Sequence, residues 1–367
     1  MTVYQPEYLE TLPPAAVFST GRTGNTILHM KKRILKALVV LSSAIILVIL
    51  IFFTNSLDEL ALMFQSAKLH WIAAGFGCMV MYWAFDALIL HAVAKGLLED
   101  QPVRDTVRVT MIGQFFNAVT PLSGAGQPVQ AYVMVKDGIK PGHAASIIII
   151  KTLLHQIIIV LYAVAAFASR GALFDARIPR FNYLFALGLA LNSAFLLFYA
   201  LFIFKKEAAA KVLSVVFRLL GKMKFIKRTD ALHEKVEKEL ASFREGAGIL
   251  KNNARTLVNL ILFQILQFTF YFSVPFFIHL AVEKDAIRFW DMISAQSMII
   301  LISLLVPSPG ATGGLEGLSY LFYGMFFRQG FIIPVILIYR LLTYYASVVI
   351  GGLFTLFAPE KPLKRIE

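Results

Sequence analysis

Residues 181–204 read FNYLFALGLALNSAFLLFYALFIF and contain no charged side chain. At about 1.5 Å per residue, a helix of this length crosses a hydrocarbon layer of about 30 Å. Similar apolar runs occur at residues 36–54, 71–94, 144–168, 256–282 and 331–357. Because lipid offers no partner to backbone amides, such runs form helices, and the alternation of a β-barrel strand is missing from them. The sequence therefore predicts an all-α polytopic integral membrane protein with about six full spans.

The composition agrees with a membrane protein. Of the 367 residues, 58% are hydrophobic and 16% are charged, whereas soluble domains are about 45–50% apolar. The first run is too long for a signal peptide and lacks a small-residue cleavage site, so we expect it to remain as a span. The single cysteine, Cys78, rules out a disulfide framework or a cysteine-based metal site. No metal or other cofactor is predicted.

Two further apolar segments, 106–135 and 290–327, are each interrupted by proline and glycine. The interruptions read NAVTPLSGAGQP at 117–128 and PSPGATGGLE at 307–316. Pro121 and Pro309 are 188 positions apart, and three predicted spans lie between the copies. An odd number of spans inverts the second copy, as in transporters built from inverted repeats of broken helices. We therefore predict two re-entrant helical hairpins whose tips meet near the bilayer midplane; the alternative is two Pro-kinked helices that cross the membrane twice.

Charge predicts the orientation and the domain limits. Lys and Arg are concentrated in the connections on one side of the predicted spans, which places both termini in the cytoplasm, in a bacterial inner membrane. Residues 205–255 are expected to form a cytoplasmic amphipathic basic segment near anionic lipid heads, or else a solvated connector. Residues 1–30 are expected to be a disordered extension, and 358–367 a short cytoplasmic tail. The net charge of +13 is thus explained without nucleic acid.

The two interrupted segments resemble the signature segments of the lysylphosphatidylglycerol synthase/flippase transmembrane family, and the likeness covers residues 31–357. In the multiple peptide resistance members of that family, this region precedes a cytosolic domain that transfers lysine from aminoacyl-tRNA to phosphatidylglycerol. Only 358–367 follow the last predicted span, so the resemblance implies the flippase-like domain without the synthase domain. The first motif often carries an acidic residue where this chain has Gln127, whereas Glu316 keeps the acid.

Ionisable groups inside the predicted spans are candidate site residues, because they are costly in lipid. Arg340 lies nine residues beyond Phe331, about 13 Å deep. Its planar guanidinium suits a lipid phosphate; the alternative is an ion pair with Glu316 or Asp86 that locks helices together. Asp86 is expected to be that counter-ion or a proton carrier.

Other polar residues in the spans have two interpretations each. Lys151 and His155 share a helix face. Lys151 is expected to snorkel to the cytoplasmic surface, and His155 to relay protons or to make one interhelical hydrogen bond. Helix–helix hydrogen bonds are expected from Gln264 and Gln267, and either a headgroup pocket or aromatic packing is expected from Tyr339, Tyr344 and Tyr345.

The predicted function is a lipid translocase that shields the headgroup of a phospholipid, or of an aminoacyl-phospholipid such as lysylphosphatidylglycerol, in a midplane cavity. One alternative is a phosphatidylglycerol lysyltransferase, linked to cationic peptide resistance, that acts with a separate synthase partner. Another is a non-transporting membrane subunit. A homo-oligomer is a further alternative for the assembly of the chain. No Walker, HExxH or Gly-x-Ser-x-Gly motif occurs, so no catalytic residue is predicted. The predicted substrate-binding residues are Arg340, Glu316, Asn117, Pro121, Gly124, Gly126, Gln127, Pro309, Gly313, Gly314, Asp86 and His155.

Overall fold

The computed structural model describes residues 65, 67–98, 102–120, 125–204, 254–283, 285–306 and 311–357. Every regular element within these residues is a helix. Five helices there are long and apolar enough to cross a membrane: Leu69–Lys95, Pro141–Asp175, Phe181–Ala200, Ala254–Val282 and Gln329–Phe357. The predicted all-α polytopic fold is confirmed. Four predicted segments lie outside the described residues: the run at 36–54, the two terminal tails and almost all of 205–255.

The long helices are α3 (Leu69–Lys95), α6 (Pro141–Asp175), α7 (Phe181–Phe204) and α10 (Ala254–Val282). The last span is continuous but changes its winding. It consists of η1 (Gln329–Phe331), α13 (Ile332–Arg340), the π-helical turn η2 (Leu341–Tyr345) and α14 (Ala346–Phe357). Pro141 occupies the first turn of α6, where its fixed φ and missing N–H do no harm.

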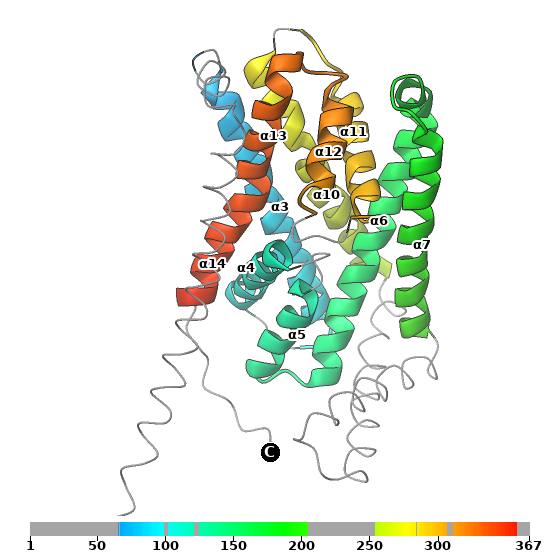
Figure 1. The fold of residues 1–367 in the computed structure, drawn as a ribbon. Helices are drawn as coiled ribbons and strands as arrows, with labels where there is room; N and C mark the ends of the chain where they lie inside the picture. The colour runs from blue at the N-terminus through cyan, green and yellow to red at the C-terminus, as the bar shows by residue number, and fades with distance from the viewer. Residues whose placement is uncertain are drawn as a thin grey trace, which may run out of the picture.

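Each interrupted segment forms a pair of short helices that pack against each other. Hairpin 1 is α4 (Val103–Val119) with α5 (Gly126–Lys136), and hairpin 2 is α11 (Phe289–Ser303) with α12 (Gly314–Tyr323). The chain enters hairpin 1 from the lower end of α3 and hairpin 2 from the upper end of α10 (Figure 1). The hairpins thus insert from opposite ends of the bundle. Their helices, at 10 to 17 residues, are shorter than a full span needs.

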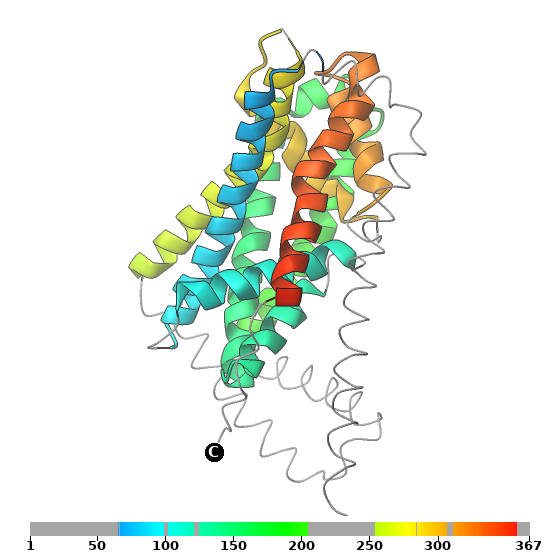
Figure 2. The ribbon, with the colours of Figure 1, turned by 90° about the vertical axis from the view of Figure 1, so that its left-hand side faces the viewer.

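Helices α3 and α10 lie side by side along one side of the bundle in Figure 2 and pack along their lengths. They are the helices that precede the two hairpins. The core around them is aromatic, with Phe272, Phe322 and Tyr339 fully buried. Offset and edge-to-face ring contacts fill such a core well.

Close backbone approach attaches the last span to hairpin 1. A Cβ at Gly351 of α14 would lie 2.5 Å from the Met111 carbonyl oxygen of α4, so only glycine allows this contact. On the other side of the bundle, Asn192 of α7 donates to the Leu301 carbonyl at 3.0 Å and accepts from Gln156 at 2.7 Å. This one side chain therefore joins α6, α7 and α11.

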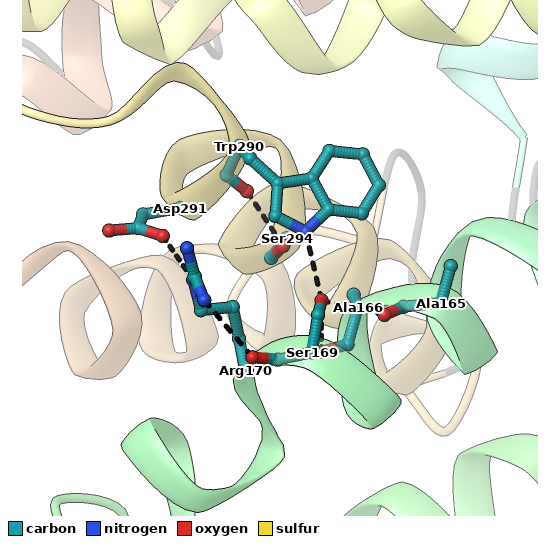
Figure 3. A network of polar contacts seen from close by, with 7 residues as sticks. All are labelled: Ala165, Ala166, Ser169, Arg170, Trp290, Asp291 and Ser294. Atoms are coloured by element: carbon teal, nitrogen blue, oxygen red, sulfur yellow. Dashed lines mark hydrogen bonds and ion pairs between the residues drawn. The ribbon is translucent and has the colours of Figure 1, made fainter.

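A polar network fixes the first helix of hairpin 2 to the upper end of α6 (Figure 3). Arg170 pairs with Asp291, and the Trp290 indole donates to the Ser169 hydroxyl at 2.9 Å. Trp290 and Asp291 are the second and third residues of α11, so the network sets the position from which hairpin 2 descends into the bundle.

Candidate functional site

The site is organised by the start of α12, the second helix of hairpin 2. Gly313 precedes this helix with φ +86°, a left-handed conformation that suits glycine. Its N–H donates to the Glu316 carboxylate at 2.7 Å, which satisfies one of the free amides at the helix start. At Gly314 an added Cβ would lie 2.3 Å from the Val306 side chain, so the chain passes tightly here. Both motif glycines therefore shape the turn that positions Glu316.

Arg340 ends α13, and its guanidinium contacts the same carboxylate. Its Nε lies 2.7 Å and its Nη2 2.5 Å from Glu316 Oε1. The guanidinium also lies 5.1 Å from the ring centroid of Tyr344. The residue is 6% exposed, while the Glu316 side chain is 29% exposed. The predicted alternative of an Arg340–Glu316 ion pair is thus confirmed as a contact, and it does not bury the carboxylate fully.

A pocket of about 310 Å³ lies against this pair. Its lining consists of Glu316, Gly317, Tyr320, Ile333, Ile336, Leu337, Arg340 and Tyr345. The lining is almost entirely apolar apart from the Arg340–Glu316 pair and the tyrosine hydroxyls. Tyr320 is 50% and Ile333 40% exposed, so the wall of the pocket reaches the outer surface of the bundle at α12 and α13.

The π-helical turn immediately follows Arg340 and contributes Tyr345 to the pocket. In a π turn one extra residue per turn shifts the following side chains around the axis, and such turns often occur at functional sites. Tyr344 contacts the guanidinium and Tyr345 lines the pocket, so two of the three tyrosines proposed for a headgroup pocket lie at the site. Tyr339 instead points into the core, where it is 0% exposed.

In hairpin 1 a hydrogen bond joins the facing ends of the two helices. The Asn117 side chain accepts a hydrogen bond from the Gly126 N–H at 3.0 Å, which ties the end of α4 to the start of α5. Gln127 is half-buried next to this contact. Pro121, Gly124 and Pro309 lie outside the described residues.

Asp86 belongs to a second polar cluster and is not the partner of Arg340. Its carboxylate binds Lys151 of α6 at 2.9 Å, Gln267 of α10 at 3.0 Å and Gln114 of α4 at 3.1 Å. The expectation that Lys151 snorkels to the surface is wrong, because the residue is 7% exposed and its ammonium is held by Asp86. The expected pairing of Asp86 with Arg340 is also wrong, because Asp86 pairs with Lys151 and Arg340 pairs with Glu316.

The remaining polar predictions also fall in this cluster. Gln267 joins α10 to Asp86 of α3, as predicted, whereas the bond from Gln264 goes to Gln267 within the same helix. The His155 ring lies 4.7 Å from the Phe268 ring and close enough to Asp86 and Lys151 to interact electrostatically with both.

Sequence reasoning missed a buried chain of hydroxyls beside the site. Gln296 of α11 accepts from the Tyr323 hydroxyl at 2.6 Å and donates to the Tyr339 hydroxyl at 2.7 Å, and Tyr339 donates to Tyr271 at 3.0 Å. The available signal was Gln296 itself, a long polar side chain in an otherwise apolar helix.

The family model of the lysylphosphatidylglycerol synthase TM region matches residues 35–351. This range contains both hairpins, the pocket and the Asp86 cluster. The chain belongs to this family. A similar relative is a UPF0104 membrane protein from Archaeoglobus fulgidus, 23% identical over 295 residues, which are 78% of this chain and 86% of that protein.

Proposed function

We propose that the chain is a lipid translocase that binds a phospholipid headgroup at the Arg340–Glu316 pair and carries it between leaflets. The observation that carries this proposal is a buried guanidinium in the lining of a largely apolar pocket whose wall reaches the outer surface of the bundle. A translocase needs this arrangement, because the headgroup must enter a polar site while the acyl chains remain in lipid.

The chemistry of the pair favours an anionic phosphate. Arginine keeps its proton at any physiological pH and offers parallel donors to a phosphate. The Glu316 carboxylate, on a side chain that is 29% exposed, adds a negative charge for an amine, which suits an aminoacyl headgroup such as that of lysylphosphatidylglycerol. The name of the matching family includes this lipid, and the apolar wall formed by Ile333, Ile336 and Leu337 suits its acyl chains.

The test is leaflet exchange of fluorescent phosphatidylglycerol and lysylphosphatidylglycerol in liposomes that contain the purified chain. Arg340→Gln should slow exchange of both lipids about tenfold or more, because a charge-assisted hydrogen bond contributes about 1.5–3 kcal/mol. Glu316→Gln should slow the lysyl lipid more than phosphatidylglycerol, because only the former carries an amine.

Arg328→Gln is the matched control, because it removes an exposed arginine from an ion pair with Glu283 outside the pocket. It should exchange lipid at the rate of the unaltered chain. If the unaltered chain exchanges neither lipid faster than protein-free liposomes, the proposal is wrong and a subunit role is favoured.

A further inference from the structure

The two halves of the molecule carry matching cations but different carboxylates. Gln127 and Glu316 are 189 positions apart, and so are Lys151 and Arg340. Each half thus has one buried cation on the span that follows its hairpin. In hairpin 2 the carboxylate comes from the hairpin itself, whereas hairpin 1 has an amide at that place. There α3 supplies Asp86 instead.

The replacement changes the chemistry of the pair. Arg340 cannot lose its proton, but a buried lysine ammonium and a carboxylate can exchange one between them or with water. Asp86 is 3% exposed and its two oxygens accept from Lys151, Gln267 and Gln114, which belong to three different helices. A change in its charge therefore acts on α4, α6 and α10 at once.

A path of polar side chains links this cluster to the pocket. Tyr82 of α3 interacts electrostatically with Asp86, and its ring lies 5.0 Å from that of Tyr271. Tyr271 accepts from the Tyr339 hydroxyl at 3.0 Å, and Tyr339 precedes Arg340 in the chain. The two cation sites are thus connected through α3, α10 and α13.

We propose that Asp86 and Lys151 form a proton-binding site that couples lipid movement to the transmembrane proton gradient. The inference rests on the proposed function. Asp86 takes one proton from one side of the membrane and its ion pair with Lys151 breaks. The same proton leaves to the other side when the pair forms again, and no bond between heavier atoms changes. While Asp86 is neutral, the Lys151 ammonium is available for a phosphate, as its counterpart Arg340 is in the other half.

The groups that face Asp86 restrict which residue carries the proton. In the described part of the chain they are Lys151 and His155 from α6 and Tyr82 from α3, with amides from α4 and α10 and Tyr271 beyond Tyr82. The π turn meets α3 at Gly75, three helical turns away. His155 is the competing proton carrier, so His155→Phe belongs in the test.

The experiment measures exchange of fluorescent phosphatidylglycerol in liposomes that contain the full chain, with the membrane potential clamped. Each sample is measured without a pH gradient, with an inside-acid gradient and with an inside-alkaline gradient. The unaltered chain should shift lipid between leaflets in opposite directions under the two gradients, by up to about tenfold for each unit of pH difference if one proton moves per lipid. His155→Phe and the control Asp285→Asn, at an exposed acid in the connection between α10 and α11, should keep this response.

Asp86→Asn and the double variant Asp86→Asn/Lys151→Met should lose the response to the pH gradient, so that exchange is the same with and without a gradient. The double variant leaves no unpaired charge in the core.

If a variant has no exchange at all, Asp86→Glu decides the question. Recovery of exchange and of the response supports the site, and failure to recover shows that Asp86 has only a structural role and overturns the proposal. Exchange by the unaltered chain that ignores the gradient, or a response that survives in Asp86→Asn, also overturns the coupling. Exchange that is missing from the unaltered chain contradicts the proposed function instead.

Discussion

At the scale of single residues, Gly126 shows how the two helices of hairpin 1 are joined. Its N–H donates to Asn117, and the two residues approach so closely that a Cβ at Gly126 would lie 2.0 Å from the Asn117 side-chain oxygen. Gly77 is a contrasting position, because it lies in α3 on the outer surface with no atom within 4 Å of its Cβ direction. Substitutions at these two glycines therefore distinguish the effect of side-chain packing on stability from the effect of helix propensity.

Gly126→Ala should lower the free energy of unfolding by about 1–3 kcal/mol, because the methyl group displaces Asn117 and breaks its hydrogen bond. The measurement is the midpoint of thermal unfolding in detergent. Gly77→Ala should leave the midpoint unchanged or raise it slightly, since alanine favours a helix by about 1 kcal/mol over glycine. Equal midpoints for the two variants would show that the Asn117–Gly126 contact contributes nothing.

At the scale of elements, hairpin 2 is held in the bundle by polar contacts at both ends. Near the bundle surface, Arg170 and Asp291 join α6 to α11, and in the core Gln296 joins α11 to α12 and α13 through two tyrosines. Since Arg340 ends α13 and Glu316 begins α12, the core contact fixes the two helices that form the pocket.

Gln296→Leu should destabilise the protein by about 1–2 kcal/mol, because it leaves the Tyr323 and Tyr339 hydroxyls without their shared amide in a buried site. Lipid exchange should also slow, because α12 and α13 are no longer held together. Thermal unfolding and exchange are measured on the same preparation. Ser294→Ala, in the same helix, removes a hydroxyl that bonds only to the Trp290 carbonyl within α11. If it has as large an effect as Gln296→Leu, the interhelical amide is not the cause.

At the scale of the whole molecule, the two hairpins insert from opposite ends of the bundle, so residues near those ends allow a direct test of its orientation in the membrane. Lys140 precedes α6 at the lower end of the bundle, and Asp285 lies in the connection between α10 and α11 at the upper end (Figure 1). Both are exposed. The positive-inside rule, applied to the basic connections, places Lys140 in the cytoplasm and Asp285 outside.

Cysteine substitution at these two positions tests the prediction. In a Cys78→Ala background, which removes the one native thiol, Asp285→Cys should react with an impermeant maleimide added to intact cells. Lys140→Cys should react only after the cells are opened. The reverse pattern would invert the orientation, and labelling of both from outside would show that the three helices between these positions, α6, α7 and α10, do not all cross the membrane.

The sequence by itself determined the class of fold and most of its elements. Long uncharged runs have one stable form in lipid, the helix, and Pro/Gly interruptions at two related places indicated the two hairpins. It also located Arg340, Glu316, Asn117 and Gly126, because polar residues and glycines are conspicuous in apolar segments. The pairing of these residues was decided only by the tertiary structure. Asp86 and Lys151 are far apart in sequence, and α3, α4, α6 and α10 had to pack before their charges met.

The pocket and the hydroxyl chain of Gln296 likewise depend on the packing of α11, α12 and α13. The physical reason is that hydropathy acts along the chain and fixes each helix separately, whereas an ion pair or a hydrogen bond depends on which faces of two helices meet. That depends on the shapes of all neighbouring side chains together, and no local stretch of sequence contains it.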